Sequence, residues 1–252
     1  MEWYWILLIV LGSIVLLLLI MSLFYYPFLK RACDIVCALA VFAFLWPLYL
    51  IIAILVKTKL GSPIYFKQVR PGKDGKLFAM YKFRSMSNKT DEKGNLLPDG
   101  ERLTKFGKWL RKTSLDEMPE AFNILIGDMS VIGPRPLLVK DYVFFNDEIM
   151  KRQSVKPGLS GLAQINGRNN ITWEGKFEQD LIYIKKISFW KDIAIVFKSF
   201  FKAFVKRDDI DREGFDTDED YGDHLLRIGQ ISNKEYDQKT LKAKELLDGY
   251  GK

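Results

Sequence analysis

The hydrophobic pattern divides the chain into an apolar first quarter and a mixed remainder. The stretch from Trp3 to Tyr26 carries no charge and has aromatic residues at both ends. As a helix it would be roughly 36 Å long, enough to cross a hydrocarbon core of about 30 Å, and its rings suit the two interfaces. The start, Met1-Glu2, lacks the basic region of a cleaved signal peptide. We therefore predict a transmembrane helix within residues 1–28.

A second apolar run, from Ile35 to Val56, is also long enough to span a bilayer. Lys30 and Arg31 precede it, and further basic residues follow. Because cytoplasmic flanks are enriched in Lys and Arg, a second full crossing would export the basic remainder of the chain. Pro47 lies near the middle and removes a helical hydrogen bond where a bend would fall. An ordinary proline-kinked transmembrane helix stays open, but we predict a re-entrant helix over 29–60, broken at Pro47.

The pattern after residue 60 is typical of a small globular domain. "SPIYFKQV" and "LFAMYKF", separated by a glycine-containing turn, predict a short β-hairpin. Helices are expected over 104–112, 119–127 and 138–152, with extended or loop-rich segments between them. The predicted fold class is therefore α+β, mainly α, and membrane-associated, with a cytoplasmic catalytic domain over 61–207.

The clearest amphipathic helix runs from Lys186 to Arg207. Trp, Ile and Phe residues recur at helical spacing on one side, and lysines take the other faces. This pattern suits a helix lying in an anionic membrane interface, and it equally suits a helix packed on the domain core. Residues 208–252 are charged and lack the glycine and final acid of a calcium loop, so we interpret them as a solvated C-terminal tail.

Composition narrows the chemistry. The net charge of +7 and pI near 9.2 favour anionic partners such as nucleotides, phosphates and acidic lipids. The two cysteines, Cys33 and Cys37, lie in an apolar run and do not form a metal or disulfide motif. The single histidine, His224, excludes zinc-hydrolase motifs and Ser-His-Asp catalysis. No nucleic-acid-binding module is recognisable, so we expect no nucleic-acid partner.

An acidic pair in "RKTSLDEMPE" allows two interpretations. Ser114 and Glu117 have the spacing of a capping box, which would satisfy the first free N–H groups of a helix. The alternative is catalytic, because an Asp such as Asp116 can attack phosphorus or hold a divalent cation. The two interpretations are compatible if the positive end of that helix presents Asp116 to a phosphate.

Three arginines favour the catalytic interpretation. Arg111 comes just before the acidic pair, Arg135 lies between two prolines, and Arg168 follows a glycine. Arginines in rigid loops suit bidentate contacts with phosphate.

Three long segments carry a family resemblance. "LTKFGKWLRKTSLDEMPEAFNILIGDMSVIGPRPLL", "VKPGLSGLAQINGRNNITW" and "KRACDIVCALAVFAFLWPLY" resemble bacterial sugar transferases of the monotopic phosphoglycosyl transferase family. The resemblance covers about residues 30–207 and is closest to the small members. It implies transfer of a sugar phosphate from a UDP-sugar to undecaprenyl phosphate, with release of UMP and Mg²⁺ as cofactor.

The resemblance also implies roles for individual residues. Asp116 matches the nucleophile that forms a covalent phosphosugar intermediate, and Glu117 matches the second acid, so that both would hold Mg²⁺. Arg111, Arg135 and Arg168 match basic positions near the substrate phosphates.

The remaining implications concern the membrane. Lys30, Arg31 and Asp34 match polar positions where the re-entrant helix enters the bilayer, and Trp46-Pro47 replaces the usual Ser-Pro pair. The implied location is the bacterial inner membrane, with the catalytic domain on the cytoplasmic face. Inner-leaflet anionic lipids and downstream glycosyltransferases are further expected partners. The transferred sugar is left open, with a preference for acetylated amino sugars over galactose or glucose. The competing hypothesis is a membrane-tethered lipid-binding scaffold without catalysis.

Overall fold

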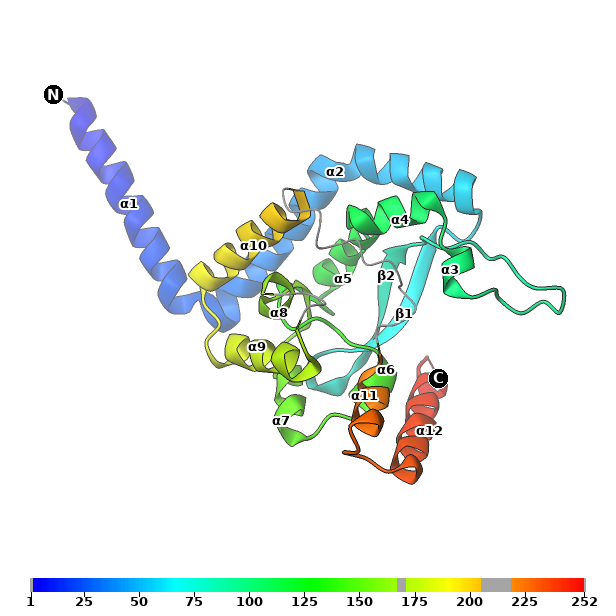
Figure 1. Ribbon diagram of the computed structural model, residues 1–252. Coiled ribbons are helices and arrows are strands. Elements are labelled where there is room, and N and C mark those ends of the chain that lie inside the picture. The colour runs from blue at the N-terminus through cyan, green and yellow to red at the C-terminus, as the bar shows by residue number, and fades with distance from the viewer. Residues whose placement is uncertain (1, 167–170, 205–218, 252) are drawn as a thin grey trace.

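A computed structural model describes residues 2–166, 171–204 and 219–251 (Figure 1). The helices are α1 (Glu2–Phe24), α2 (Lys30–Leu60), α3 (Asp99–Arg102), α4 (Lys105–Lys112), α5 (Glu120–Ile126), α6 (Val139–Tyr142), α7 (Asp147–Met150), α8 (Leu162–Ile165), α9 (Trp173–Lys185), α10 (Phe189–Phe204), α11 (Tyr221–Arg227) and α12 (Asn233–Gly249). The strands are β1 (Tyr65–Pro71), β2 (Leu77–Phe83), β3 (Ser130–Ile132) and β4 (Gly158–Ser160). This mainly helical architecture with two small sheets confirms the α+β, mainly α part of the predicted fold class.

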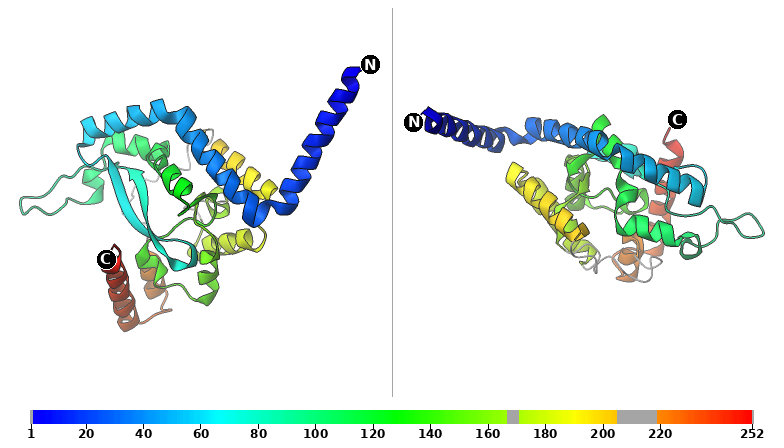
Figure 2. Two further views of the ribbon diagram at one scale, coloured as in Figure 1. Left: turned by 180° about the vertical axis from the view of Figure 1, so that it is seen from behind. Right: turned by 90° about the horizontal axis from the view of Figure 1, so that it is seen from above.

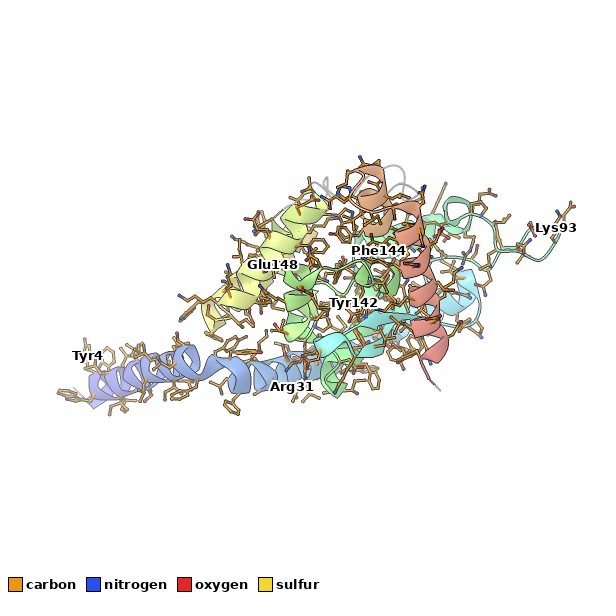
Figure 3. All side chains as sticks on the ribbon, turned by 90° about the horizontal axis from the view of Figure 1, so that it is seen from below. Tyr4, Arg31, Lys93, Tyr142, Phe144 and Glu148 are labelled. Atoms are coloured by element: carbon orange, nitrogen blue, oxygen red, sulfur yellow. The ribbon has the colours of Figure 1, made fainter. Side chains whose placement is uncertain are left out.

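Helix α1 projects away from the rest of the molecule (Figures 1 and 3). Its large apolar side chains are exposed, and Tyr4 lies near its outer end. Both α1 and α2 are long and apolar enough to cross a membrane by length and composition, with mean hydropathies of 3.1 and 2.7. An unpartnered helix of this hydropathy is stable only in an apolar surrounding. The two apolar helices therefore support a membrane location for the N-terminal part of the molecule.

Helix α2 continues through Pro47, and its axis changes direction between its two halves (Figure 1). One face packs on the domain, where Ile52 and Val56 meet Phe83 of β2. The opposite face exposes large apolar residues such as Phe44. Helix α2 therefore has one face buried in protein and one face that is apolar and exposed.

The polar residues at the start of α2 contact the domain. Arg31 donates to the carbonyls of Ile124 and Leu125 at the end of α5, at 2.6 and 2.8 Å. Asp34 accepts hydrogen bonds from the Ser130 hydroxyl and from the backbone of β3. These contacts satisfy groups that would be costly to leave unpaired at the edge of a bilayer.

The predicted hairpin is confirmed. β1 and β2 pair antiparallel from Tyr65–Phe83 to Pro71–Leu77, and a short parallel pair, β3 with β4, lies near α5 and α10. Figure 2 shows, from behind, the hairpin running between α2 on one side and the C-terminal helices on the other. On β2 the side chains of Phe78 and Met80 pack with Ile124 of α5. Helix α5 therefore packs directly against the hairpin.

The single helix expected over 138–152 is wrong. The chain forms α6, then α7, then a 3-10 turn, Lys151–Ser154. The Asn146 side chain accepts the Ile149 N–H and starts α7 anew. The interruption lets Phe144 and Phe145 both reach one aromatic core cluster, which a continuous helix would not allow on a single face.

Helix α10 packs on the domain with one face and leaves the other face exposed. Ile195 is 1% exposed and packs against Tyr183 of α9, whereas Trp190 and Phe197 on the outer side are 52% and 71% exposed. Its buried Asp192 accepts hydrogen bonds from Tyr183 at 2.8 Å and from Lys30 at 2.5 Å. The helix therefore packs on the domain and still exposes an aromatic face beside the membrane helices.

The solvated tail is wrong for residues 219–251. Tyr221 and Leu225 of α11 are buried in the same cluster as Phe144 and Phe145. The ring of Tyr236 on α12 lies 5.6 Å from that of Phe144, which Figure 3 shows next to α12. Apolar residues three and four positions apart lie between the charged residues of this segment. They cover an aromatic surface that would otherwise be exposed to water.

Candidate active site

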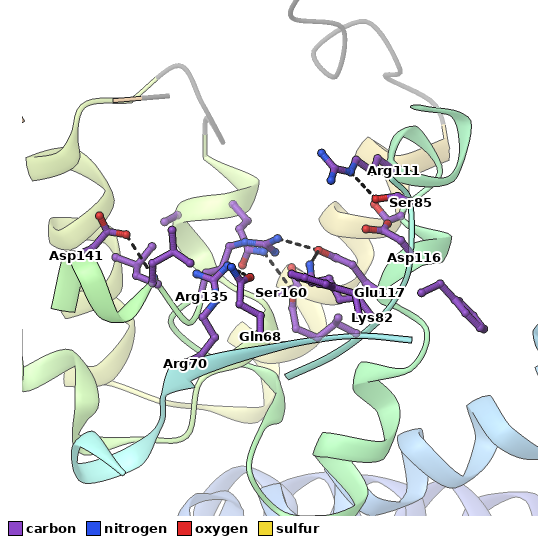
Figure 4. Close-up of a pocket in the computed structure, with 18 of the residues that line it drawn as sticks. Gln68, Arg70, Lys82, Ser85, Arg111, Asp116, Glu117, Arg135, Asp141 and Ser160 are labelled. Atoms are coloured by element: carbon purple, nitrogen blue, oxygen red, sulfur yellow. Dashed lines mark hydrogen bonds and ion pairs between the residues drawn. The ribbon is translucent and has the colours of Figure 1, made fainter. Parts of the chain in front are cut away.

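A single cleft of about 1720 Å³ contains most of the predicted site residues. It extends from Val41 and Leu45 of α2 to His224 and Arg227 of α11, and it includes the acidic pair between these ends (Figure 4). Ligand sites commonly occupy about 300 to 1000 Å³, so this cleft is larger than most. Residues of α2 line one end and residues of α11 line the other.

The acidic pair lies on a 3-10 turn, Leu115–Glu117, between α4 and α5. The predicted capping box does not form within the described residues, because Ser114 adopts a left-handed conformation (φ 54°) that ends α4. Helix α5 begins only at Glu120, so Asp116 precedes the positive helix end and is not part of its first turn. The Glu117 carboxylate, which was expected to cap the helix, points instead toward two cations, because charged partners bind it more strongly than a neutral N–H.

Lys82, at the end of β2, connects the acids of this turn. Its ammonium lies 2.8 Å from Glu117 Oε1 and 3.2 Å from Glu120 Oε1. Arg135 approaches the same Glu117 oxygen from the opposite side at 2.8 Å (Figure 4). Burial alone would raise the pKa of Glu117, but the charges and hydrogen bonds of Arg135 and Lys82 outweigh it and lower that pKa. Glu117 is therefore held as an anion by two cations.

The pKa of Asp116 shifts in the opposite direction to that of Glu117. It is 8% exposed, and burial, followed by the negative charge of Glu117, raises its pKa from 3.8 to about 6. The cations Lys82, Arg111 and Arg135 limit that rise. A carboxylate of raised pKa that is still ionised at neutral pH is more nucleophilic than an ordinary surface Asp.

Glu120 is a third acid and is nearly fully buried. Burial, followed by the charge of Glu117, raises its pKa from 4.5 to about 7. The two neighbouring acids thus titrate well above Glu117, as expected when like charges share a buried site.

Arg111 reaches the cleft from α4. Its Nε donates to the Ser85 hydroxyl at 2.8 Å, which fixes the guanidinium on the side of Asp116 away from Arg135 (Figure 4). The close approach of α4 to this segment requires Gly107, because a Cβ there would lie 1.8 Å from the Ser85 carbonyl oxygen. Two arginines therefore flank the acidic turn from opposite sides.

A buried ion pair supports Arg135. Arg152 donates to Asp180 at 2.7 Å and to the Arg135 carbonyl at 2.7 Å. Both members of the pair are 3% exposed. The Arg152–Asp180 ion pair fixes the backbone of the "GPRPLL" loop, and this holds the guanidinium of Arg135 against Glu117.

The structure thus brings together Asp116, Glu117, Arg111 and Arg135, as predicted. Arg168 lies outside the described residues, and its predicted role stays a prediction. The sequence analysis did not predict Lys82 as a site residue. Positions 78, 80 and 82 share one face of β2, so a lysine that follows two apolar residues on the buried face could have indicated a functional role.

The family profile described as bacterial sugar transferase matches residues 25–206. The uncharacterized sugar transferase EpsL of Bacillus subtilis is 47% identical over 177 residues, covering 70% of this chain and 88% of that protein. A UDP-glucose:undecaprenyl-phosphate glucose-1-phosphate transferase of Klebsiella pneumoniae is 43% identical over 188 residues, covering 71% of this chain.

Relatives with other named sugars match the same region. An undecaprenyl-phosphate galactose phosphotransferase of Salmonella typhimurium is 37% identical over 198 residues, covering 72% of this chain. The Klebsiella and Salmonella proteins are longer, and the match spans 40% and 41% of their lengths. Both the profile and the identity over most of the Bacillus protein place this chain within one family. The chain belongs to the bacterial sugar transferase family.

Proposed function

We propose that this chain transfers a sugar 1-phosphate from a UDP-sugar to undecaprenyl phosphate, releasing UMP and forming undecaprenyl diphosphate-sugar, the first membrane step of glycoconjugate synthesis. The observation that carries the proposal is the placement of Asp116 in one cleft with Arg111, Arg135 and Lys82. The names of several relatives, which act on UDP-sugars or undecaprenyl phosphate, support the same reaction.

The proposed chemistry has two balanced steps. An Asp116 carboxylate oxygen bonds to the β-phosphorus, and the bond from that phosphorus to the bridging oxygen breaks, so that UMP leaves with the electron pair. A phosphate oxygen of the lipid then attacks the same phosphorus, and the bond to Asp116 breaks and restores the carboxylate. Arg111 and Arg135 stabilise the charge on the phosphates, and Glu117 holds Arg135 and Lys82 in place.

The acidic pair also suits a divalent cation. No group of three or more His, Cys, Asp or Glu side chains in the described ranges is arranged to hold a metal. Mg²⁺, however, usually takes one or two carboxylates and completes its coordination with water and substrate phosphates. Asp116 and Glu117 therefore fit an ion that arrives with the nucleotide, where it would neutralise charge on the diphosphate.

The exposed apolar surfaces support membrane attachment on one side of the bilayer. The outer face of α10 and one face of α2 both expose large apolar side chains, and Lys198 of α10 is exposed and suits anionic headgroups. We propose that α2 enters and leaves the inner leaflet without crossing, with Pro47 inside the bilayer. The catalytic domain then lies on the cytoplasmic face of the inner membrane, where downstream glycosyltransferases could accept the product.

A UMP-release assay tests the reaction. Purified protein with Mg²⁺ and undecaprenyl phosphate is given UDP-glucose, UDP-galactose and their N-acetylated amino counterparts in turn. We expect UMP with at least one donor, its loss in Asp116→Asn, and its retention in Asp237→Asn, which makes the same change at an exposed position of α12. Lipid binding without UMP formation from any donor would instead favour the scaffold hypothesis.

The covalent step has its own test. In the absence of lipid phosphate, labelled UMP should exchange into the UDP-sugar, and a peptide containing Asp116 should gain the mass of the sugar phosphate. If exchange requires the lipid, transfer is direct and the intermediate is wrong.

Topology is tested with single cysteines in a variant lacking Cys33 and Cys37. Glu2→Cys and Lys93→Cys are treated with a membrane-impermeant maleimide in spheroplasts; Lys93 is at the tip of an exposed loop (Figure 3). A crossing α1 with a re-entrant α2 places the two positions on opposite sides of the membrane. Labelling of both from the same side would show that α2 crosses fully.

A further inference from the structure

Arg70, on β1, contributes a guanidinium to the cleft that the proposed reaction has not used. Its Nη2 donates to Gln68 Oε1 at 2.7 Å and its Nη1 to the Pro136 carbonyl at 3.2 Å. Within the described residues it forms no ion pair, and its buried Nε has no hydrogen-bond partner. A partly buried arginine held only by neutral groups retains most of its capacity to bind an anion.

Arg70 and Arg135 place two guanidiniums in the same part of the cleft. Burial, followed by the charge of Arg135, lowers the pKa of Arg70 to about 10, and the charges of Asp141 and Glu120 only partly offset that shift. Arg135 must already share Glu117 with Lys82. Two guanidiniums that face the same cleft repel each other unless an anion lies between them. This part of the cleft therefore favours a ligand with at least one more phosphate charge.

The direction of the reaction identifies which phosphate fits there. Figure 4 shows Arg135 and Arg70 on the opposite side of Glu117 from Asp116. Attacking and leaving oxygens lie roughly in line across the phosphorus in phosphoryl transfer. The phosphate that leaves must therefore lie away from Asp116, in the direction of the arginine pair. In the second step the lipid phosphate attacks from the side that UMP left.

We propose that Arg70 and Arg135 form one phosphate subsite that binds the UMP phosphate in the first step and the lipid phosphate in the second. The ligand class is a phosphate monoester, and the subsite explains how a soluble nucleotide and a lipid can use one cleft in turn. This inference rests on the proposed function for the order of the two ligands, but binding of either ligand can be measured without turnover.

The test is direct binding to Asp116→Asn protein in nanodiscs, with UMP and farnesyl phosphate as probes and uridine and farnesol as neutral controls. Adding Arg70→Gln should weaken binding of both phosphates about tenfold or more, the usual effect of losing a charged hydrogen bond, and leave the neutral probes unchanged. Arg70→Lys keeps the charge and should recover part of the loss. Lys76→Gln, which makes the same charge change at an exposed turn position outside the cleft, should have no effect.

Separate outcomes identify which idea has failed. If Arg70→Gln binds both phosphates within twofold of its parent, the subsite is wrong even when the parent enzyme releases UMP. If UMP binding weakens and farnesyl phosphate binding does not, the shared use of the site is wrong. If the neutral probes weaken equally, Arg70 only supports the fold. Failure of the parent to release UMP from any donor concerns the proposed function and leaves these binding results valid.

Discussion

Asp116→Asn should make the protein more stable while it abolishes UMP release. The Asp116 carboxyl is buried, and its pKa is raised from 3.8 to about 6 by burial and by Glu117. The difference corresponds to roughly 3 kcal/mol at about 1.36 kcal/mol per pH unit, which the folded state loses by keeping this group ionised. An amide of the same size avoids that cost. The pKa of about 6 already includes the attraction of Asp116 to Lys82 and Arg111, so we expect a net gain of about 2 to 3 kcal/mol.

The stability difference between Asp116→Asn and the parent should depend on pH. The folded state binds the Asp116 proton more tightly than the unfolded chain does, so the favourable contribution is complete below about pH 4 and is lost as pH rises through about 6. The stability advantage of Asp116→Asn should therefore be absent near pH 4 and complete above about pH 6. Nucleophilic activity of the parent should follow the ionised form and fall as pH drops through about 6.

The assay is thermal unfolding of both proteins in one detergent from pH 4 to 8. A gain of about 2 kcal/mol corresponds to a rise in Tm of roughly 4 to 8 °C for a chain of this size. Glu117→Gln is the matched control: its carboxylate holds Lys82 and Arg135, so its loss should lower stability by roughly 1 to 3 kcal/mol. Equal destabilisation by both amides, or a gain that does not depend on pH, would contradict the assigned electrostatics.

Three further substitutions test contacts that stabilise the fold around the site or position its residues. Asp192→Asn removes the carboxylate that holds the buried lysine at the start of α2, and should cost roughly 3 to 5 kcal/mol in unfolding free energy and speed proteolysis of α10. Leu225→Ala, at a position 5% exposed, should cost roughly 2 to 5 kcal/mol in chemical denaturation, whereas Leu241→Ala, at 58%, should stay within about 0.5 kcal/mol. Gly107→Ala would push α4 from Ser85 and displace the α4 arginine, so UMP release should fall about tenfold to 100-fold; an unchanged rate would show that this close approach is not needed.

The residues of the candidate site were predictable only where they lay in a recognisable motif. Asp116, Glu117, Arg111 and Arg135 lie in segments rich in Pro, Gly and charge, and they do meet in one cleft. Lys82 and Glu120 looked like ordinary positions of a strand and a helix. Their partners are distant in sequence, and no local pattern indicates that a lysine and a glutamate will be buried together.

Local patterns also failed where tertiary contacts offered a stronger alternative. The spacing of Ser114 and Glu117 predicted a capping box, but Glu117 binds two cations supplied by a strand and a loop. The charged tail concealed Tyr221 and Leu225, whose burial depends on an aromatic surface formed by residues far earlier in the chain. In both cases a short-range preference worth about 1 kcal/mol competes with larger long-range energies.

The sequence by itself determined the apolar N-terminal helices, the hairpin, the short helices α4 and α5, and the family to which the chain belongs, because periodicity and motifs are local properties. Only the tertiary structure decided which carboxylate is held as an anion and which has a raised pKa. The opposite pKa shifts of the two carboxylates follow from their burial and from the contacts of Lys82 and Arg135 with Glu117. The order of Asp116 and Glu117 along the chain sets neither of these.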